Sequence, residues 1–77
     1  MKDDVTVKIV EHLATLSTSP GGWAKELNMV SWNGSAAVYD LRKWSPNHDK
    51  CNRGVTLTDY EMNMLLEAVR QRSGGEK

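Results

Sequence analysis

The stretch MVSWNGSAAVYDLRKW, residues 29–44, decides the fold of this chain. At its centre stand Asn33 and Gly34, the pair that best tolerates the positive φ angles of a type I′ turn. After this pair, apolar and polar side chains alternate from Tyr39 to Arg42, which is typical of a strand. We therefore predict a β-hairpin that joins a strand over residues 24–32 to a strand over residues 36–44.

The second strand of this hairpin carries the first functional signal. Side chains alternate between the two faces of a strand, so Tyr39 and Leu41 face one way while Arg42 and Trp44 face the other. Tyr39 and Leu41 suit a core. We expect Arg42 and Trp44 to lie on an open sheet face, where a cation beside a large aromatic ring indicates a ligand.

Two further strands flank the hairpin. Residues 5–17 begin with alternating β-branched side chains, which favours a strand, although the spacing of the apolar residues in the second half also fits a helix face. Residues 18–22, TSPGG, form a loop. Residues 45–53 form a polar loop, and a short strand follows over residues 54–58.

A C-terminal helix follows the last strand. Thr58 and Glu61 have the spacing of a capping box, in which each side chain bonds a backbone N–H of the first turn. An amphipathic stripe follows, made of Met62, Leu65, Leu66 and Val69. Ser73 and the two glycines after it end the helix.

These elements predict an α+β fold, a curved four-stranded antiparallel sheet (β-β-β-β) with one C-terminal helix. Residues 1–72 form a single domain, and residues 73–77 are expected to be a disordered tail. One helix covers one sheet face, which leaves the other face for solvent, a partner or a ligand. A chain of 77 residues buries a small core, and the helix carries more apolar surface than one face needs, so we expect a homodimer.

Composition limits the environment of the protein. The single cysteine, Cys51, excludes an intrachain disulfide and fits a reducing compartment. The sequence has no run of 18 apolar residues and begins without the apolar stretch of a signal peptide. We expect a cytoplasmic protein that does not enter membranes.

Metal and enzyme chemistry find little support. His48 and Cys51 lie three residues apart, but with Asp49 they make a poor zinc set, and His12 is remote in the sequence. Cys51 beside a histidine suggests a nucleophile and a base, yet nothing in the sequence orients the pair. We predict no metal, no cofactor and no enzymatic activity.

Nucleic-acid binding finds more support, although the formal net charge is zero. Single strands bind where aromatic rings stack on bases and cations hold phosphates. The candidate stacking residues are Trp32 and Trp44, with Trp23 as a weaker candidate. The candidate phosphate-binding residues are Arg42 and Arg53, with Lys43 as a weaker candidate. The glycine after Arg53 would let the backbone approach a ligand closely.

Three stretches together resemble a known family: GWAKELNMVSWN at residues 22–33, YDLRKWSP at residues 39–46 and RGVTLT at residues 53–58. In this order and spacing they resemble the single-stranded-DNA-binding domain of the positive cofactor four family of transcriptional coactivators. The chain looks closer still to the bacterial YdbC-like members. The likeness covers nearly the whole chain.

The resemblance implies a homodimer that is formed through the helix and the sheet edges. It also implies binding of single-stranded DNA across the sheets, largely without sequence preference. By position, Trp32 matches the aromatic before the hairpin turn and Arg42 the arginine of the third strand. Trp44 lies near the family's next aromatic, shifted by one residue, Arg53 stands where lysine is more usual, and Lys25 fits the YdbC-like pattern.

This chain lacks the basic or serine-rich extensions of the eukaryotic members, so coactivator function does not carry over. We predict sequence-tolerant binding of single-stranded DNA, or of RNA, in replication, repair or transcription, by a bacterial nucleoid-associated or phage-encoded protein. The alternative is a protein-interaction module on the same dimeric scaffold, with a polymerase or replication protein as partner and only weak affinity for nucleic acid.

Overall fold

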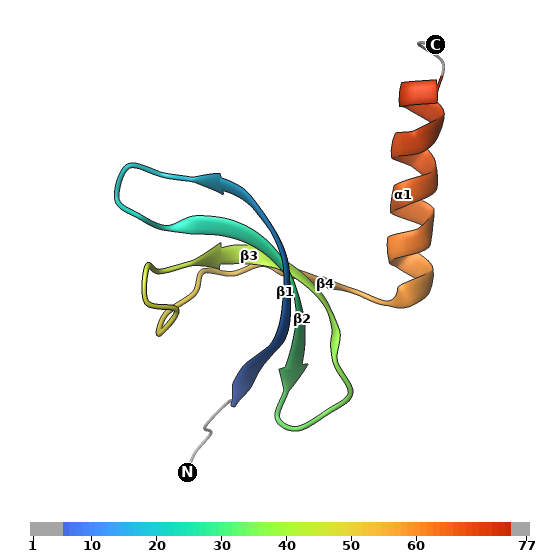
Figure 1. The fold of residues 1–77 in the computed structure, drawn as a ribbon. Helices are drawn as coiled ribbons and strands as arrows, with labels where there is room; N and C mark the ends of the chain where they lie inside the picture. The colour runs from blue at the N-terminus through green and yellow to red at the C-terminus, as the bar shows by residue number, and fades with distance from the viewer. Residues whose placement is uncertain (1–5, 75–77) are drawn as a thin grey trace.

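A computed structural model describes residues 6–74 as a four-stranded antiparallel sheet followed by one helix. The strands are β1 (Val7–Thr18), β2 (Ala24–Trp32), β3 (Val38–Trp44) and β4 (Val55–Leu57), and the helix is α1 (Asp59–Gly74). The strands follow one another in space in chain order, so that β1 and β4 form the two edges. This confirms the predicted α+β fold and its meander. Figure 1 shows the strong curvature of the sheet and the helix standing away from it.

β1 is a strand along its whole length, but an irregular one. Its register with β2 shifts three times, and each shift leaves one residue of β1 without a partner: Val10, Leu13 and Leu16. These are β-bulges, which bend a strand and increase its twist. They recur every three residues, which explains why the apolar pattern of this segment also fitted a helix.

The hairpin between β2 and β3 contains the predicted turn. Asn33 and Gly34 have φ angles of 52° and 79°, and the Ser35 N–H donates to the Trp32 carbonyl at 2.9 Å. Both values lie in the left-handed region that a type I′ turn requires. The second strand begins at Val38 rather than at residue 36.

The helix begins with the predicted capping box. The Thr58 N–H donates to Glu61 Oε1 at 2.8 Å, and the Glu61 N–H donates to Thr58 Oγ1 at 3.1 Å. α1 continues to Gly74, two residues beyond the predicted domain end, and the rest of the expected tail, residues 75–77, lies outside the described residues.

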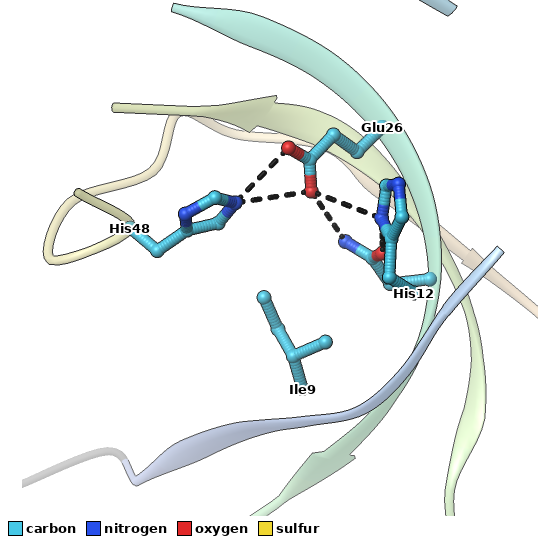
Figure 2. A pocket seen from close by; sticks show the side chains of 5 residues that line it. Ile9, His12, Glu26 and His48 are labelled. Carbon is cyan, nitrogen blue, oxygen red and sulfur yellow. Dashed lines mark hydrogen bonds and ion pairs between the residues drawn. The ribbon is translucent and has the colours of Figure 1, made fainter. Parts of the chain in front are cut away.

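The more buried sheet face is the opposite of the expected one. Val30, Asn28 and Asp40 are fully buried, and Trp44 is only 3% exposed, whereas Tyr39 and Leu41 are half-buried. The Arg42 side chain, on the same face, is 11% exposed. The expectation that Arg42 and Trp44 lie on an open face is therefore wrong. The physical reason is curvature, because the strands bend around this face and the loop after β3 folds against it (Figure 2).

The apolar stripe of α1 is mostly uncovered in the single chain. Met62 is buried, but the expectation that its companions pack on the sheet is wrong for one copy of the chain. The exposed apolar side chains of α1 are Tyr60, Met64, Leu65, Leu66 and Val69. Among residues 6–74, no helix has the length and apolarity to cross a membrane.

Candidate nucleic-acid interface

Two lysines face each other near one end of the sheet. In the β2–β3 ladder, Lys25 of β2 lies directly opposite Lys43 of β3, so both side chains occupy the same face. Like charges in this arrangement repel and destabilise a sheet. Neither lysine forms an ion pair with any residue between 6 and 74. The pair therefore favours an anion as its partner.

This lysine pair belongs to a larger basic pocket of about 340 Å³. The pocket is lined by Lys25, Leu41, Arg42, Lys43, Asn52 and Arg53. All four cations that the sequence singled out for phosphate binding line this pocket, but they come from both sides of the sheet: the Lys25 and Lys43 side chains lie on one face, and Arg42 lies on the face of Glu26. We call this group of six residues the basic pocket.

Arg42 is held rigidly at the basic pocket. Its Nε donates to both carboxylate oxygens of Asp40, at 2.8 and 3.0 Å, and its Nη1 donates to the Asn52 carbonyl at 3.2 Å. Its Cζ also lies 4.8 Å from the centre of the Trp32 ring, a cation–π contact. Burial lowers the pKa of the Arg42 guanidinium, but the hydrogen bond and charge of Asp40, assisted by Cys51, outweigh burial and raise it. Arg42 is thus a fixed positive charge.

The three tryptophans differ in their access to a ligand. Trp32 is half-buried and already stacks against Arg42, and Trp23 is half-buried at the start of β2. Trp44 is buried beneath the loop after β3, with its ring centre 5.8 Å from that of His48. The structure therefore brings Trp32 to Arg42 but does not offer the Trp44 ring to a base.

Gly54, next to Arg53, is packed against β3. A Cβ atom at Gly54 would collide with the Arg42 side chain and with the Leu41 carbonyl oxygen. The sequence suggested that this glycine allows close approach of a ligand. In the structure it allows close approach of the chain to Arg42, which brings Arg53 beside the other cations.

A polar network that no sequence pattern indicated lies on the buried face (Figure 2). The Glu26 side chain is 7% exposed and lies between two imidazoles. His48 Nε2 lies 3.2 and 3.0 Å from the two Glu26 oxygens, and His12 Nδ1 lies 3.6 Å from Oε1. Asn28 Nδ2 donates to Glu26 Oε1 at 3.1 Å. A pocket of about 300 Å³ opens between these groups and Ile9.

Charge explains how Glu26 stays ionised there. Burial raises the pKa of the Glu26 carboxyl, but the hydrogen bonds from Asn28 and His48, with the charges of His48 and His12, lower it below its ordinary value. His12 and His48 are far apart in the sequence, whereas β1 and the loop bring both to one carboxylate. The signal that could have placed His12 near Glu26 is its pairing with Asn28 across β1 and β2. The bulges of β1 shift the register of the two strands, so this pairing could not be read from the sequence.

This network does not form a metal centre. Among residues 6–74, no group of three or more histidine, cysteine or acidic side chains has the geometry to hold a metal ion. Cys51 is a free thiol whose backbone bridges to Trp44. The network holds the loop after β3 to the sheet through the contact between His48 and Glu26.

Comparison with known proteins defines the relationship of the chain. No family model matches it. An uncharacterized protein of Treponema pallidum (strain Nichols) is 41% identical over 73 residues, which cover 95% of this chain and 86% of the relative. The chain belongs to the same family as this Treponema protein.

Proposed function

We propose that this protein binds single-stranded nucleic acid, without strong sequence preference, as a homodimer. The observation that carries the proposal is the basic pocket, where Lys25 and Lys43 lie opposite each other beside Arg42 and Arg53. Repulsion between Lys25 and Lys43 is relieved when phosphates bind, and the spread of the four cations over neighbouring strands suits a chain of phosphates. Lysines and arginines of this kind supply most of the affinity for a polyanion.

Trp32 is the proposed stacking residue. It is half-buried, and its contact with Arg42 fixes the ring next to a cation. A base that stacks on an aromatic ring contributes about 1–3 kcal/mol and needs no particular sequence. Trp23 is a second stacking candidate, whereas Trp44 supports the loop from below.

Homodimerisation is part of the proposal because a single copy leaves two apolar surfaces uncovered. One is the stripe of α1, and the other is the half-buried sheet face that carries Leu27, Met29, Tyr39, Leu41 and Leu57. The helix of a second copy has the apolar character to cover this face. Small domains without disulfides gain their missing core in this way.

The test is a titration with a dT oligonucleotide and with a duplex of equal length, followed by tryptophan fluorescence at several salt concentrations. We expect quenching and tighter binding with the single strand. If about four phosphates are neutralised, log K falls with log[salt] with a slope of about −2.8. The Lys25→Gln/Lys43→Gln double variant should reduce this slope by about 1.4.

Lys8→Gln is the matched control, because Lys8 is exposed on β1 outside the basic pocket. It should leave the slope of the wild type nearly unchanged. Absence of binding by the wild type at low salt would overturn the proposal and favour the protein-interaction module, for which the exposed stripe of α1 is the supporting observation.

A further inference from the structure

The loop between β3 and β4, residues 45–54, is tied to the sheet at two places. At one place His48 contacts Glu26. At the other, the Asn52 N–H donates to the Lys43 carbonyl at 3.0 Å, and the Asn52 carbonyl accepts from Arg42. Arg53 follows directly, so the path of this loop sets the position of one cation of the basic pocket.

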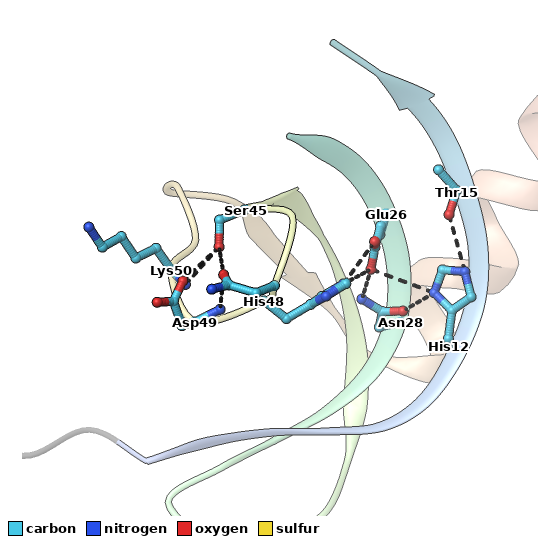
Figure 3. A network of polar contacts seen from close by, with 9 residues as sticks. His12, Thr15, Glu26, Asn28, Ser45, His48, Asp49 and Lys50 are labelled. Carbon is cyan, nitrogen blue, oxygen red and sulfur yellow. Dashed lines mark hydrogen bonds and ion pairs between the residues drawn. The ribbon is translucent and has the colours of Figure 1, made fainter. Parts of the chain in front are cut away.

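Between these two ties the loop is internally bonded (Figure 3). Ser45 Oγ donates to Asp49 Oδ1 at 3.0 Å and accepts from the Lys50 N–H at 3.1 Å. The Ser45 N–H also donates to the Lys50 carbonyl at 3.0 Å. These bonds hold the residues on both sides of His48 together, so we expect a displacement of His48 to reach Asn52.

His48 is held in an unusual backbone conformation. Its φ is 63°, in the left-handed region that residues other than glycine seldom adopt. Such a conformation persists where the surroundings impose it, and it clusters at functional positions. Here it turns the imidazole toward the buried carboxylate of Glu26, so the Glu26–His48 contact compensates for the backbone cost.

The contact responds to protons for a simple reason. His48 Nε2 faces only carboxylate oxygens, so it must carry a hydrogen. A second proton on the ring turns a neutral hydrogen bond into an ion pair, and histidine changes charge within the physiological range of pH.

Other charged groups face Glu26 as well. They are His12 on β1, and Asp40 and Arg42 on β3. Asp40 and Arg42 neutralise each other in their ion pair. His12 Nδ1 lies 3.6 Å from Glu26 without a hydrogen bond to it, and its hydrogen bonds go to Asn28 and Thr15 within the sheet. Of the two imidazoles around Glu26, His48 is the one that belongs to the loop.

We propose that Glu26 and His48 form a proton-linked latch that positions Arg53 and the Asn52 carbonyl at the basic pocket. The latch closes as His48 gains its proton and loosens as the proton leaves. Both residues are positioning residues and do not themselves bind the ligand. For its effect on affinity this inference rests on the proposed function, whereas its effect on the loop does not.

The first arm of the test uses the protein without nucleic acid. The backbone amide signals of Asn52 and Arg53 are followed by NMR between pH 5 and 8, together with the His48 ring protons. We expect both amides to shift with the same midpoint as His48 in the wild type and in His12→Gln. In His48→Gln and in Glu26→Gln this shared transition should disappear. If the chemical shifts of these amides do not change as His48 titrates, the latch is overturned.

The second arm measures affinity for a dT oligonucleotide at pH 6 and pH 8. The ion pair of a half-exposed histidine is weak and corresponds to about a two- to fivefold change in an equilibrium constant. We therefore expect the wild type to bind the oligonucleotide about two- to fivefold more tightly at pH 6 than at pH 8. His48→Gln should lose this difference, and His12→Gln should keep it.

The two arms separate the two proposals. If His12→Gln and His48→Gln both lose the affinity difference between pH 6 and pH 8 to the same extent, the effect is a general gain of positive charge. That result would overturn the latch. If the NMR result holds but no variant binds the oligonucleotide, the latch stands and the proposed function fails. If His48→Gln does not fold, Glu26→Gln takes its place in both arms of the test, because it removes the charge of the latch and preserves the shape of the side chain.

Discussion

At the scale of single residues, Glu26 shows how a buried charge is tolerated. Its carboxylate is removed from water, which is unfavourable unless hydrogen bonds and opposite charges compensate. Asn28, His48 and His12 provide this compensation, and together they lower the pKa of Glu26 despite burial. The charged form of Glu26 therefore stabilises the fold.

Glu26→Gln should show this as a pH-dependent loss of stability. Because the folded pKa is lowered, the stabilisation is fully present above the ordinary value of 4.5 and is lost as the pH falls through the folded value. We expect the variant to be less stable by about 1–3 kcal/mol at pH 5.5 and the gap to narrow toward pH 3. Urea unfolding at both pH values measures this, and a gap that widens toward pH 3 would contradict it.

Gly54→Ala should damage the fold and the basic pocket together. The added methyl group would collide with the Leu41 carbonyl oxygen and the base of the Arg42 side chain, both of which are held within β3. We expect a loss of about 1–3 kcal/mol in the free energy of unfolding, as for an overpacked site. Gly21→Ala is the control, because nothing lies within 4 Å of its Cβ position. Equal stability of the two variants would refute the close packing.

The sequence could predict the composition of the basic pocket, but not all of its surroundings. Arg42 and Arg53 were recognised from residue type and position, Lys25 from the family resemblance, and Lys43 as a weaker candidate. The burial of Trp44 was not, because strand alternation distinguishes the two faces without telling which of them a curved sheet encloses. The role of Glu26 also escaped, because its histidines come from segments far apart in the sequence.

At the scale of elements, local chemistry fixes the helix start most clearly. The reciprocal bonds of Thr58 and Glu61 were predictable, because they depend on a spacing of three residues. β1 was harder to predict, since its bulges depend on pairing with β2. Local signals therefore specified the turn and the cap, and long-range pairing specified the shape of the sheet.

Thr58→Ala should weaken α1 at its N-terminus. Loss of a capping hydroxyl costs about 1 kcal/mol, and we expect a fall of this size in the free energy of unfolding. Glu61→Gln is the control, because glutamine also completes a capping box. The measurement is urea unfolding followed by circular dichroism, and a larger effect for Glu61→Gln than for Thr58→Ala would speak against the cap.

At the scale of the whole molecule, the single chain has a poor core. Its buried apolar side chains, among the described residues, are Val30, Trp44 and Met62. Domains of this size bury a modest part of their surface even when well packed. The exposed stripe of α1 therefore points to stability that depends on association.

Thermal stability should rise with protein concentration, because a second copy that binds the folded state shifts the equilibrium. Leu66→Glu should abolish this dependence and yield a monomer by light scattering, since Leu66 is exposed on the apolar stripe. Asn63→Glu adds the same charge at an exposed polar position of α1 and should remain dimeric. If the thermal stability of the wild type does not depend on protein concentration and its mass is that of a monomer, homodimerisation is removed from the proposed function.

The bulges of β1 have a consequence for solubility. β1 is a long edge strand, and an exposed edge with apolar side chains is a template on which further strands add and fibrils grow. Val10, Leu13 and Leu16 interrupt the regular spacing of backbone donors and acceptors every three residues. The regular stretches of β1 are therefore only two or three residues long, so an incoming regular strand cannot pair along the edge, and this irregularity protects the edge from aggregation.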